Sequence, residues 1–234
     1  MNSLNRYHGI LNEYIQPWDE LNLSYWRLWY NHDVNKVVIL DGCNICGREE
    51  DSIVLPKEVE FLFISNCNDV RNISNIPTFN ALERLEILRL QILSNLSGIL
   101  LNVSESSPAG LYSHLKIVGI YGCEKLEKLI SSKLMLELKN LEQIDVEDCT
   151  EMEELIAVDD DDEEERSPKE FLLPKLKSLT LSHLPKLKSI CSCNGILKAV
   201  MTDYQNSPMH NKDMKKKKNV IVGSATQVLS SVSL

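Results

Sequence analysis

One apolar spacing recurs along the chain and restricts its fold more than any other feature of the sequence. Residues 115–130 are LKIVGIYGCEKLEKLI and residues 141–156 are LEQIDVEDCTEMEELI, with apolar residues and one cysteine in matching places. The shared template is L-x-x-L-x-L-x-x-C-x-x-L. Complete copies begin at Val59, Leu85, Leu115, Leu141 and Leu176, and a weaker copy begins at Asn35. A repeated template of this kind predicts stacked units rather than one closed core.

The spacing of the copies predicts a leucine-rich-repeat solenoid. The ninth template position falls at residues 43, 67, 93, 123, 149 and 184, which gives steps of 24, 26, 30, 26 and 35 residues. Leucine-rich repeats have units of about 20–29 residues with this core. The two longer steps contain a polar segment at 102–110 and an acidic insert loop at 158–170, and insertions of this kind map to loops on one face.

The alternation within the template indicates how each unit buries its apolar side. Leu-x-Leu forms a short strand with both leucines on one face, and stacked units share a continuous core. We therefore expect an α/β fold, namely a horseshoe of about six irregular repeats with a parallel β-sheet on its concave face. Residues 34–195 form this domain.

The ends of the chain lack the template. Residues 1–33 hold half of the aromatic residues, including Trp18, Trp26 and Trp29, and we interpret them as a degenerate repeat or a cap. Residues 196–234 lose the leucine spacing and contain the run Lys215 to Lys218. We expect this part to be a non-repeat, disordered tail.

Composition excludes several classes of protein. The net charge is −9, of which seven negative charges lie in the run Asp159 to Glu165, so a basic face for nucleic acid is not expected. No apolar run approaches the ~20 residues of a membrane helix, and the N-terminus does not have the pattern of a signal peptide. Seven widely spread cysteines fit reduced thiols, so a cytoplasmic protein is expected.

Two kinds of side chain suggest chemistry, but structural interpretations are preferred. The cysteines at the ninth template position, Cys43, Cys67, Cys123 and Cys149, are expected to be buried small residues that donate to a nearby loop. A zinc site built from Cys43, Cys46, Cys191 and Cys193 is disfavoured because these pairs lie near opposite ends of the array. The acidic run and the lysine run are interpreted as solvated segments.

No catalytic group can be nominated. The five histidines are far apart in sequence, and the chain contains neither H-E-x-x-H nor G-x-S-x-G. We therefore expect a protein that is not an enzyme and that has no cofactor or metal.

The residues between the template leucines are the candidate binding residues. They form three columns across the strands, which begin with Phe61, Phe63 and Ser65. Exposed aromatic and charged side chains on a concave sheet suit protein contacts. The predicted partner-binding residues are Phe61, Phe63, Arg89, Ile117, Tyr121, Gln143, Asp145, Glu147 and Thr180. The alternative is that these are ordinary solvated strand residues, or that a loop covers Phe61 and Phe63.

Several segments resemble a known family. VLPKEVEFLFISNCNDV, LKIVGIYGCEKLEKLI, LEQIDVEDCTEMEELIAV and LPKLKSLTLSHLPKLKSIC are similar to the C-terminal leucine-rich repeats of plant disease-resistance proteins of the coiled-coil, nucleotide-binding (NB-ARC) type. The resemblance covers about residues 36–193. It implies an intracellular immune receptor whose repeats restrain a nucleotide-binding domain and help to sense pathogen effectors or guarded host proteins.

The chain departs from that family because it has no G-x-x-x-x-G-K-[ST] phosphate loop. Nucleotide binding therefore cannot be assigned to any residue, and the chain is expected to be the repeat region without its nucleotide-binding module. Two alternatives remain open, namely a truncated fragment without independent function and a piece of an extracellular leucine-rich-repeat receptor. The extracellular alternative is disfavoured because the repeats lack a G-x-I-P element.

Overall fold

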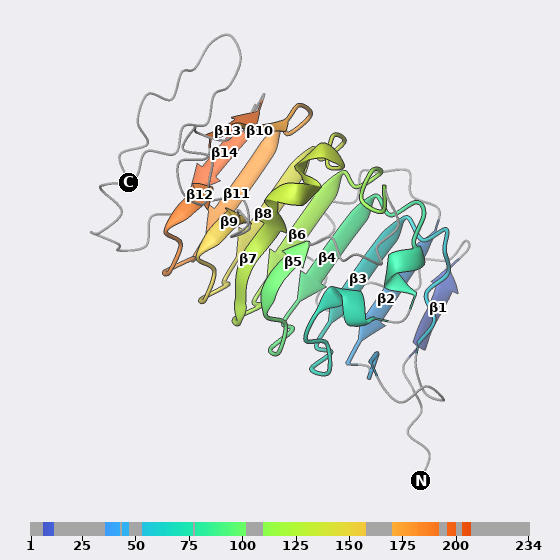
Figure 1. Cartoon of the computed structure of the whole chain (residues 1–234). Helices are drawn as coiled ribbons and strands as arrows, with labels where there is room; N and C mark the ends of the chain where they lie inside the picture. The colour runs from blue at the N-terminus through green and yellow to red at the C-terminus, as the bar shows by residue number, and fades with distance from the viewer. Residues whose placement is uncertain are drawn as a thin grey trace.

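The chain folds as a parallel β-solenoid, in which strands from successive turns stack side by side (Figure 1). The computed structural model describes residues 7–11, 36–42, 44–46, 53–76, 78–101, 110–157, 170–191, 196–199 and 203–206. Most of residues 1–33, the acidic run and the lysine run lie outside these residues. Among the described residues, no helix is long and apolar enough to cross a membrane.

The larger sheet has eight strands in the order β1-β2-β3-β4-β6-β8-β11-β14. Only β1, at one edge, is antiparallel to its neighbour. The strands are β1 (Tyr7–Leu11), β2 (Val37–Asp41), β3 (Phe61–Ser65), β4 (Ile87–Gln91), β6 (Ile117–Tyr121), β8 (Gln143–Glu147), β11 (Ser178–Ser182) and β14 (Asp203–Asn206). The six template copies thus coincide with β2, β3, β4, β6, β8 and β11.

The template leucines form the core, as predicted. In the third copy, Leu85, Leu88, Leu90, Leu93 and Leu96 all have no measurable exposure. The template residues of the other complete copies are at most 5% exposed, except Leu184, which is partly buried and packs against the core. Each turn thus contributes a row of side chains to one continuous interior, which is how a solenoid stabilises units that cannot bury their own apolar side.

The opposite side of the solenoid consists of short strands and 3-10 helices. A second parallel sheet has the order β12-β9-β7-β5, and a third pairs β10 with β13. These strands are β5 (Gly98–Leu101), β7 (Leu126–Ser131), β9 (Glu154–Ala157), β10 (Glu170–Leu173), β12 (Ser189–Cys191) and β13 (Ile196–Ala199). Four turns contribute one strand to each of the two larger sheets, and these turns contain β4 and β5, β6 and β7, β8 and β9, and β11 and β12.

The helical part of the expected α/β fold is not observed. The described residues contain three 3-10 helices, η4 (Ile73–Asn75), η5 (Phe79–Ala81) and η6 (Ser132–Leu136), and no α-helix. The return segments are short, and β5, β7, β9 and β12 span only three to six residues each. Segments of this length with apolar runs favour strands, because helices usually need at least about 10–12 residues.

Strand pairing extends beyond residue 195, where the sequence predicted the start of a disordered tail. Strand β13 pairs in parallel with β10, and β14 pairs in parallel with β11. The segments ILKA and DYQN lack the leucine spacing, so the open edges of β10 and β11 provide the backbone partners that the local sequence does not predict. The remaining tail lies outside the described residues.

A residue in the left-handed backbone conformation directly follows each strand of the larger sheet that carries a template copy. The residues at this corner, with φ between 50° and 63°, are Gly42, Asn66, Ile92, Gly122, Asp148 and His183. The corner backbone N–H groups continue the ladder, since Asn66 donates to Gln91 and Asp148 donates to Ser182. Glycine and asparagine suit this conformation, whereas a β-branched residue such as Ile92 is strained there.

The template cysteines follow this corner and are structural. Cys67, Cys123 and Cys149 have no measurable exposure. Each thiol donates to the carbonyl two residues earlier, with the Cys67 Sγ lying 3.1 Å from the Ser65 oxygen and the Cys149 Sγ 3.4 Å from the Glu147 oxygen. This confirms the predicted burial at the three described cysteines, while Cys43 lies outside the described residues.

Candidate protein-binding face

The strand registers bring the three predicted columns together. Phe61, Ile87, Ile117, Gln143 and Ser178 are successive partners across β3, β4, β6, β8 and β11. The same registers align the columns that begin at Phe63 and at Ser65. These side chains alternate with the buried template leucines, so they lie on the outer face of the larger sheet.

Burial divides the nine predicted binding residues into two groups. Phe63, Arg89 and Ile117 are buried, with exposures of 5%, 4% and 2%. The expectation that these three are exposed for contact with a partner is therefore wrong. Phe61, Tyr121, Gln143, Asp145, Glu147 and Thr180 are of intermediate exposure. The predicted binding residues that a partner can reach therefore lie on β6, β8 and β11, apart from Phe61 on β3.

A second apolar cluster explains why Phe63 is buried. Val37, Ile39 and Phe63 form a cluster separate from the main core, with Phe61 packed against it. Val37 and Ile39 alternate with the core residues of β2, so this cluster lies on the outer face of the sheet. The sequence contains a signal for this outer cluster. Residues 37–40, VVIL, are apolar at every position, which is typical of a strand buried on both faces.

An ion pair crosses the middle of the face. The Arg89 Nη1 atom lies 3.3 Å from the Asp145 Oδ2 atom, and the two side chains are 5% and 15% exposed. Gly119 is the register partner of both residues and lies between them. A Cβ atom at position 119 would lie 2.8 Å from the Cδ and Cζ atoms of Arg89. The absence of a side chain at Gly119 therefore creates the space through which the guanidinium reaches Asp145.

Burial and neighbouring side chains have opposite effects on the pKa of Asp145. Burial raises the pKa of Asp145, while Arg89, Gln143 and Thr180 oppose the rise without cancelling it. The Gln143 Nε2 atom donates to Asp145 Oδ2 over 2.8 Å. Burial likewise lowers the pKa of Arg89, with Asp145 acting against that change. These neighbours thus fix the position of the Asp145 side chain on the accessible face.

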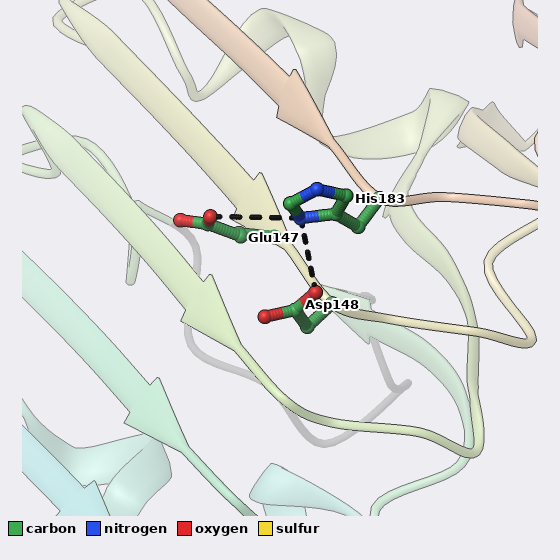
Figure 2. A group of neighbouring side chains, drawn as sticks. All are labelled: Glu147, Asp148 and His183. Atoms are coloured by element: carbon green, nitrogen blue, oxygen red, sulfur yellow. Dashed lines mark ion pairs between the residues drawn. The ribbon is translucent and has the colours of Figure 1, made fainter. Parts of the chain in front are cut away.

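A group of polar side chains lies at the carboxyl ends of β8 and β11 (Figure 2). The His183 Nδ1 atom lies 3.1 Å from Asp148 Oδ1 and 3.8 Å from Glu147 Oε1. All three side chains are between 42% and 45% exposed. His183 and Asp148 were missed as neighbours because they are 35 residues apart in sequence, although both occupy the eighth template position.

The buried thiols are chemically protected. Burial raises the pKa of Cys123 to about 11 and that of Cys191 to about 12, so both are protonated at neutral pH. A thiol that is buried and protonated is a poor nucleophile and a poor metal ligand. Cys43 and Cys193, the other members of the disfavoured zinc site, lie outside the described residues.

A model of a known family matches part of the chain. The family described as "Plant disease resistance protein RPS2-like, leucine-rich repeats" matches residues 89–201. The matched segment includes β6, β7, β8, β9 and β11, which are the strands that form and support the accessible face. No solved structure gives a significant match to the chain.

A curated relative points to the same class of protein. Probable disease resistance protein At4g27220 of Arabidopsis thaliana is 27% identical over 179 residues. The alignment covers 72% of this chain but 18% of the relative's length. In its sequence as well as in its parallel β-solenoid, the segment 89–201 is therefore similar to the leucine-rich-repeat region of RPS2-like plant disease resistance proteins.

Proposed function

We propose that this chain is a protein-recognition domain of a plant immune receptor, composed of about six irregular leucine-rich repeats. The similarity to disease resistance proteins supports the biological setting. On this proposal the domain acts inside the cell, by binding and without catalysis. Its partners are the nucleotide-binding domain of a receptor, a pathogen effector or a guarded host protein.

The accessible part of the larger sheet carries this proposal. Its outward positions on β6, β8 and β11 include Tyr121, Asp145 and Glu147, and none of these positions is a lysine or an arginine. Arg89, the basic residue of the neighbouring strand, is buried and paired with Asp145. Because Arg89 and Asp145 offset each other, the face carries its negative charge at Glu147, with one aromatic side chain at its edge. This combination favours a partner that presents basic residues.

The half-exposed residues suit a recognition surface better than the buried ones do. A parallel sheet holds their Cα positions about 4.8 Å apart from strand to strand, so the side chains are presented on a rigid support. Tyrosine contributes a large contact area at low cost in conformational entropy. Tyr121 is accordingly the proposed aromatic anchor, and Glu147, its register partner on β8, is the proposed charged contact.

Photocrosslinking tests this assignment. A benzoyl-phenylalanine in place of Tyr121 is expected to crosslink to a purified nucleotide-binding domain of a plant resistance protein. The control places the same crosslinking residue at Leu136 on η6, which is 79% exposed and does not belong to the larger sheet. Crosslinking from position 136 but not from position 121 would place the partner elsewhere on the solenoid.

A further inference from the structure

Three side chains from two neighbouring turns converge at the corner that follows β8 and β11. Glu147 ends β8, Asp148 occupies the left-handed position after it, and His183 occupies the same position after β11. One oxygen or nitrogen atom from each residue lies within 4.8 Å of the other two. Figure 2 shows the two carboxylates directed toward the same edge of the imidazole.

The backbone holds two of these residues in fixed relative positions. The Asp148 N–H group donates to the Ser182 carbonyl over 3.1 Å, which continues the ladder between β8 and β11 past the ends of the strands. The convergence therefore follows from the register of the sheet and does not depend on a flexible loop. Rigid sheet elements are the supports on which ligand sets are positioned most accurately.

The equivalent corner between β2 and β3, four turns earlier, shows what is special about this one. There the Asp41 Oδ1 atom accepts hydrogen bonds from Ser65 Oγ and from Asn66 Nδ2, the latter over 2.8 Å. That corner joins one carboxylate to an amide, which is a neutral donor. The corner at Glu147, Asp148 and His183 has two carboxylates and an imidazole, so it combines excess negative charge with a nitrogen ligand.

We propose that Glu147, Asp148 and His183 bind a divalent transition-metal ion of the zinc type. Zn²⁺ takes nitrogen from histidine and oxygen from carboxylates at about 2.0–2.2 Å, and three protein ligands leave a position for water. The His183 Nδ1 atom lies within ion-pair distance of both carboxylates. A cation bound between these three atoms balances the two carboxylate charges and requires an imidazole whose Nδ1 atom is unprotonated.

The observed distances are close to those that a bound ion requires. Two atoms bound at ~2.1 Å to a tetrahedral ion lie roughly 3.4 Å apart. The His183 Nδ1 to Asp148 Oδ1 distance of 3.1 Å and the His183 Nδ1 to Glu147 Oε1 distance of 3.8 Å bracket this value. Because the side chains are about half exposed, small rotations complete the geometry and water supplies the remaining ligand.

Titration of the whole chain with cobalt(II) chloride, followed by visible absorption and by competition with zinc chloride, tests the proposal. The wild type is expected to saturate at one ion per chain. Asp148→Asn and His183→Asn are expected to weaken binding at least about tenfold, because each removes a ligand. Asparagine tolerates the left-handed backbone and already occupies this corner at Asn66, so both variants keep the local fold.

The control is His114→Asn. His114 contacts Ser113 through Nδ1 at 3.2 Å, much as His183 contacts Ser182, but no carboxylate pairs with His114 among the described residues. This variant is expected to bind cobalt as the wild type does. The proposal is overturned by wild-type binding that does not saturate, by equal binding in His183→Asn, or by a thiolate-to-cobalt charge-transfer band, which would place the ion on cysteine.

Discussion

The Arg89 guanidinium passes over Gly119 to reach Asp145, so a residue of β4 is paired with a residue of β8 across the intervening strand β6. Three successive turns of the solenoid are thereby joined on the outer face of the sheet, in addition to their shared core. The side chains of Arg89 and Asp145 are both charged and largely buried. Their ion pair therefore contributes to the stability of the fold and also fixes the positions of two side chains on the outer face.

Removal of Arg89 is expected to destabilise the fold strongly. Arg89→Ala leaves the Asp145 carboxylate largely buried without its cationic partner, and loss of one member of a buried pair costs about 3–5 kcal/mol. Because Asp145 keeps some exposure and its hydrogen bond from Gln143, we expect about 3 kcal/mol. Urea unfolding followed by circular dichroism measures this change.

The control for Arg89→Ala is Lys57→Ala. The Lys57 side chain is 65% exposed, and its Nζ atom lies 3.7 Å from the Oε1 atom of Glu83, whose side chain is 66% exposed. An exposed pair of this kind contributes at most about 1 kcal/mol. Equal losses of stability in the two variants would show that the buried position of Arg89 has no energetic importance.

A methyl group at position 119 is expected to displace the guanidinium. Gly119→Ala places a Cβ atom too close to Arg89, and the resulting overpacking typically costs about 1–3 kcal/mol. The double variant Arg89→Ala/Gly119→Ala removes the atoms that would clash. We therefore expect Gly119→Ala to cost less in the Arg89→Ala background, as a double-mutant cycle in urea would measure. Additive effects would argue that Gly119 is required for another reason.

The corner residue Ile92 is expected to be a site where substitution stabilises the protein. Its φ is 50° and its side chain is 41% exposed, so the strained backbone is combined with an unfavourable apolar surface. Ile92→Asn is expected to stabilise the fold by about 1 kcal/mol, since asparagine tolerates this conformation. Val54→Asn, at an exposed valine, is the control and is expected to change stability by less than about 0.5 kcal/mol. A loss of stability in Ile92→Asn would contradict the interpretation of Ile92 as strained.

Alkaline pH is expected to weaken the fold through the buried thiols. Burial raises the pKa of Cys123 from its ordinary 9.0 to about 11, so the folded state keeps a proton that the unfolded chain loses above pH 9. The stabilisation is complete below pH 9 and decreases as the pH rises toward 11. At pH 10.5 the expected loss from this group is about 2 kcal/mol, at about 1.4 kcal/mol for each pKa unit.

The variant Cys123→Ala isolates this effect. The free energy of unfolding of the wild type and of the variant is measured in urea at pH 8 and at pH 10.5. The variant is less stable at pH 8 because it lacks the buried sulfur, but its further loss at pH 10.5 is expected to be smaller than that of the wild type. An identical loss in both proteins would mean that Cys123 does not titrate differently on unfolding.

The strands and their alignment could be predicted from the sequence because the template fixes which residues face the core. Leu88 and Leu90, with Leu85 before them, define both the position of β4 and its register with β3 and β6. The burial of Cys67, Cys123 and Cys149 follows from the same template. The additional strands β13 and β14 could not be predicted, because their pairing depends on the open edges of β10 and β11 rather than on their own sequence.

The accessibility of the outer face was harder to predict than its composition. Alternation places Phe63 and Ile117 outward, but their burial depends on what packs against the sheet, and the template carries no information on that. The Arg89–Asp145 pair also escaped prediction, although the three aligned residues Arg89, Gly119 and Asp145 contain its signal: opposite charges on either side of a glycine. The contact between His183 and Asp148 has a similar signal, namely a shared template position.

The central claim, that the acidic face on β6, β8 and β11 binds a protein partner, is tested most directly by charge reversal at Glu147. The dissociation constant for a purified nucleotide-binding domain of a plant resistance protein is measured by biolayer interferometry for the wild type, Glu147→Lys and Glu127→Lys. Glu127 is exposed on β7 and provides the matched reversal on the second sheet. We expect Glu147→Lys to raise the dissociation constant at least about tenfold, which corresponds to about 1.4 kcal/mol, and Glu127→Lys to leave it unchanged. Equal affinities for the wild type and Glu147→Lys would contradict the assignment of this face.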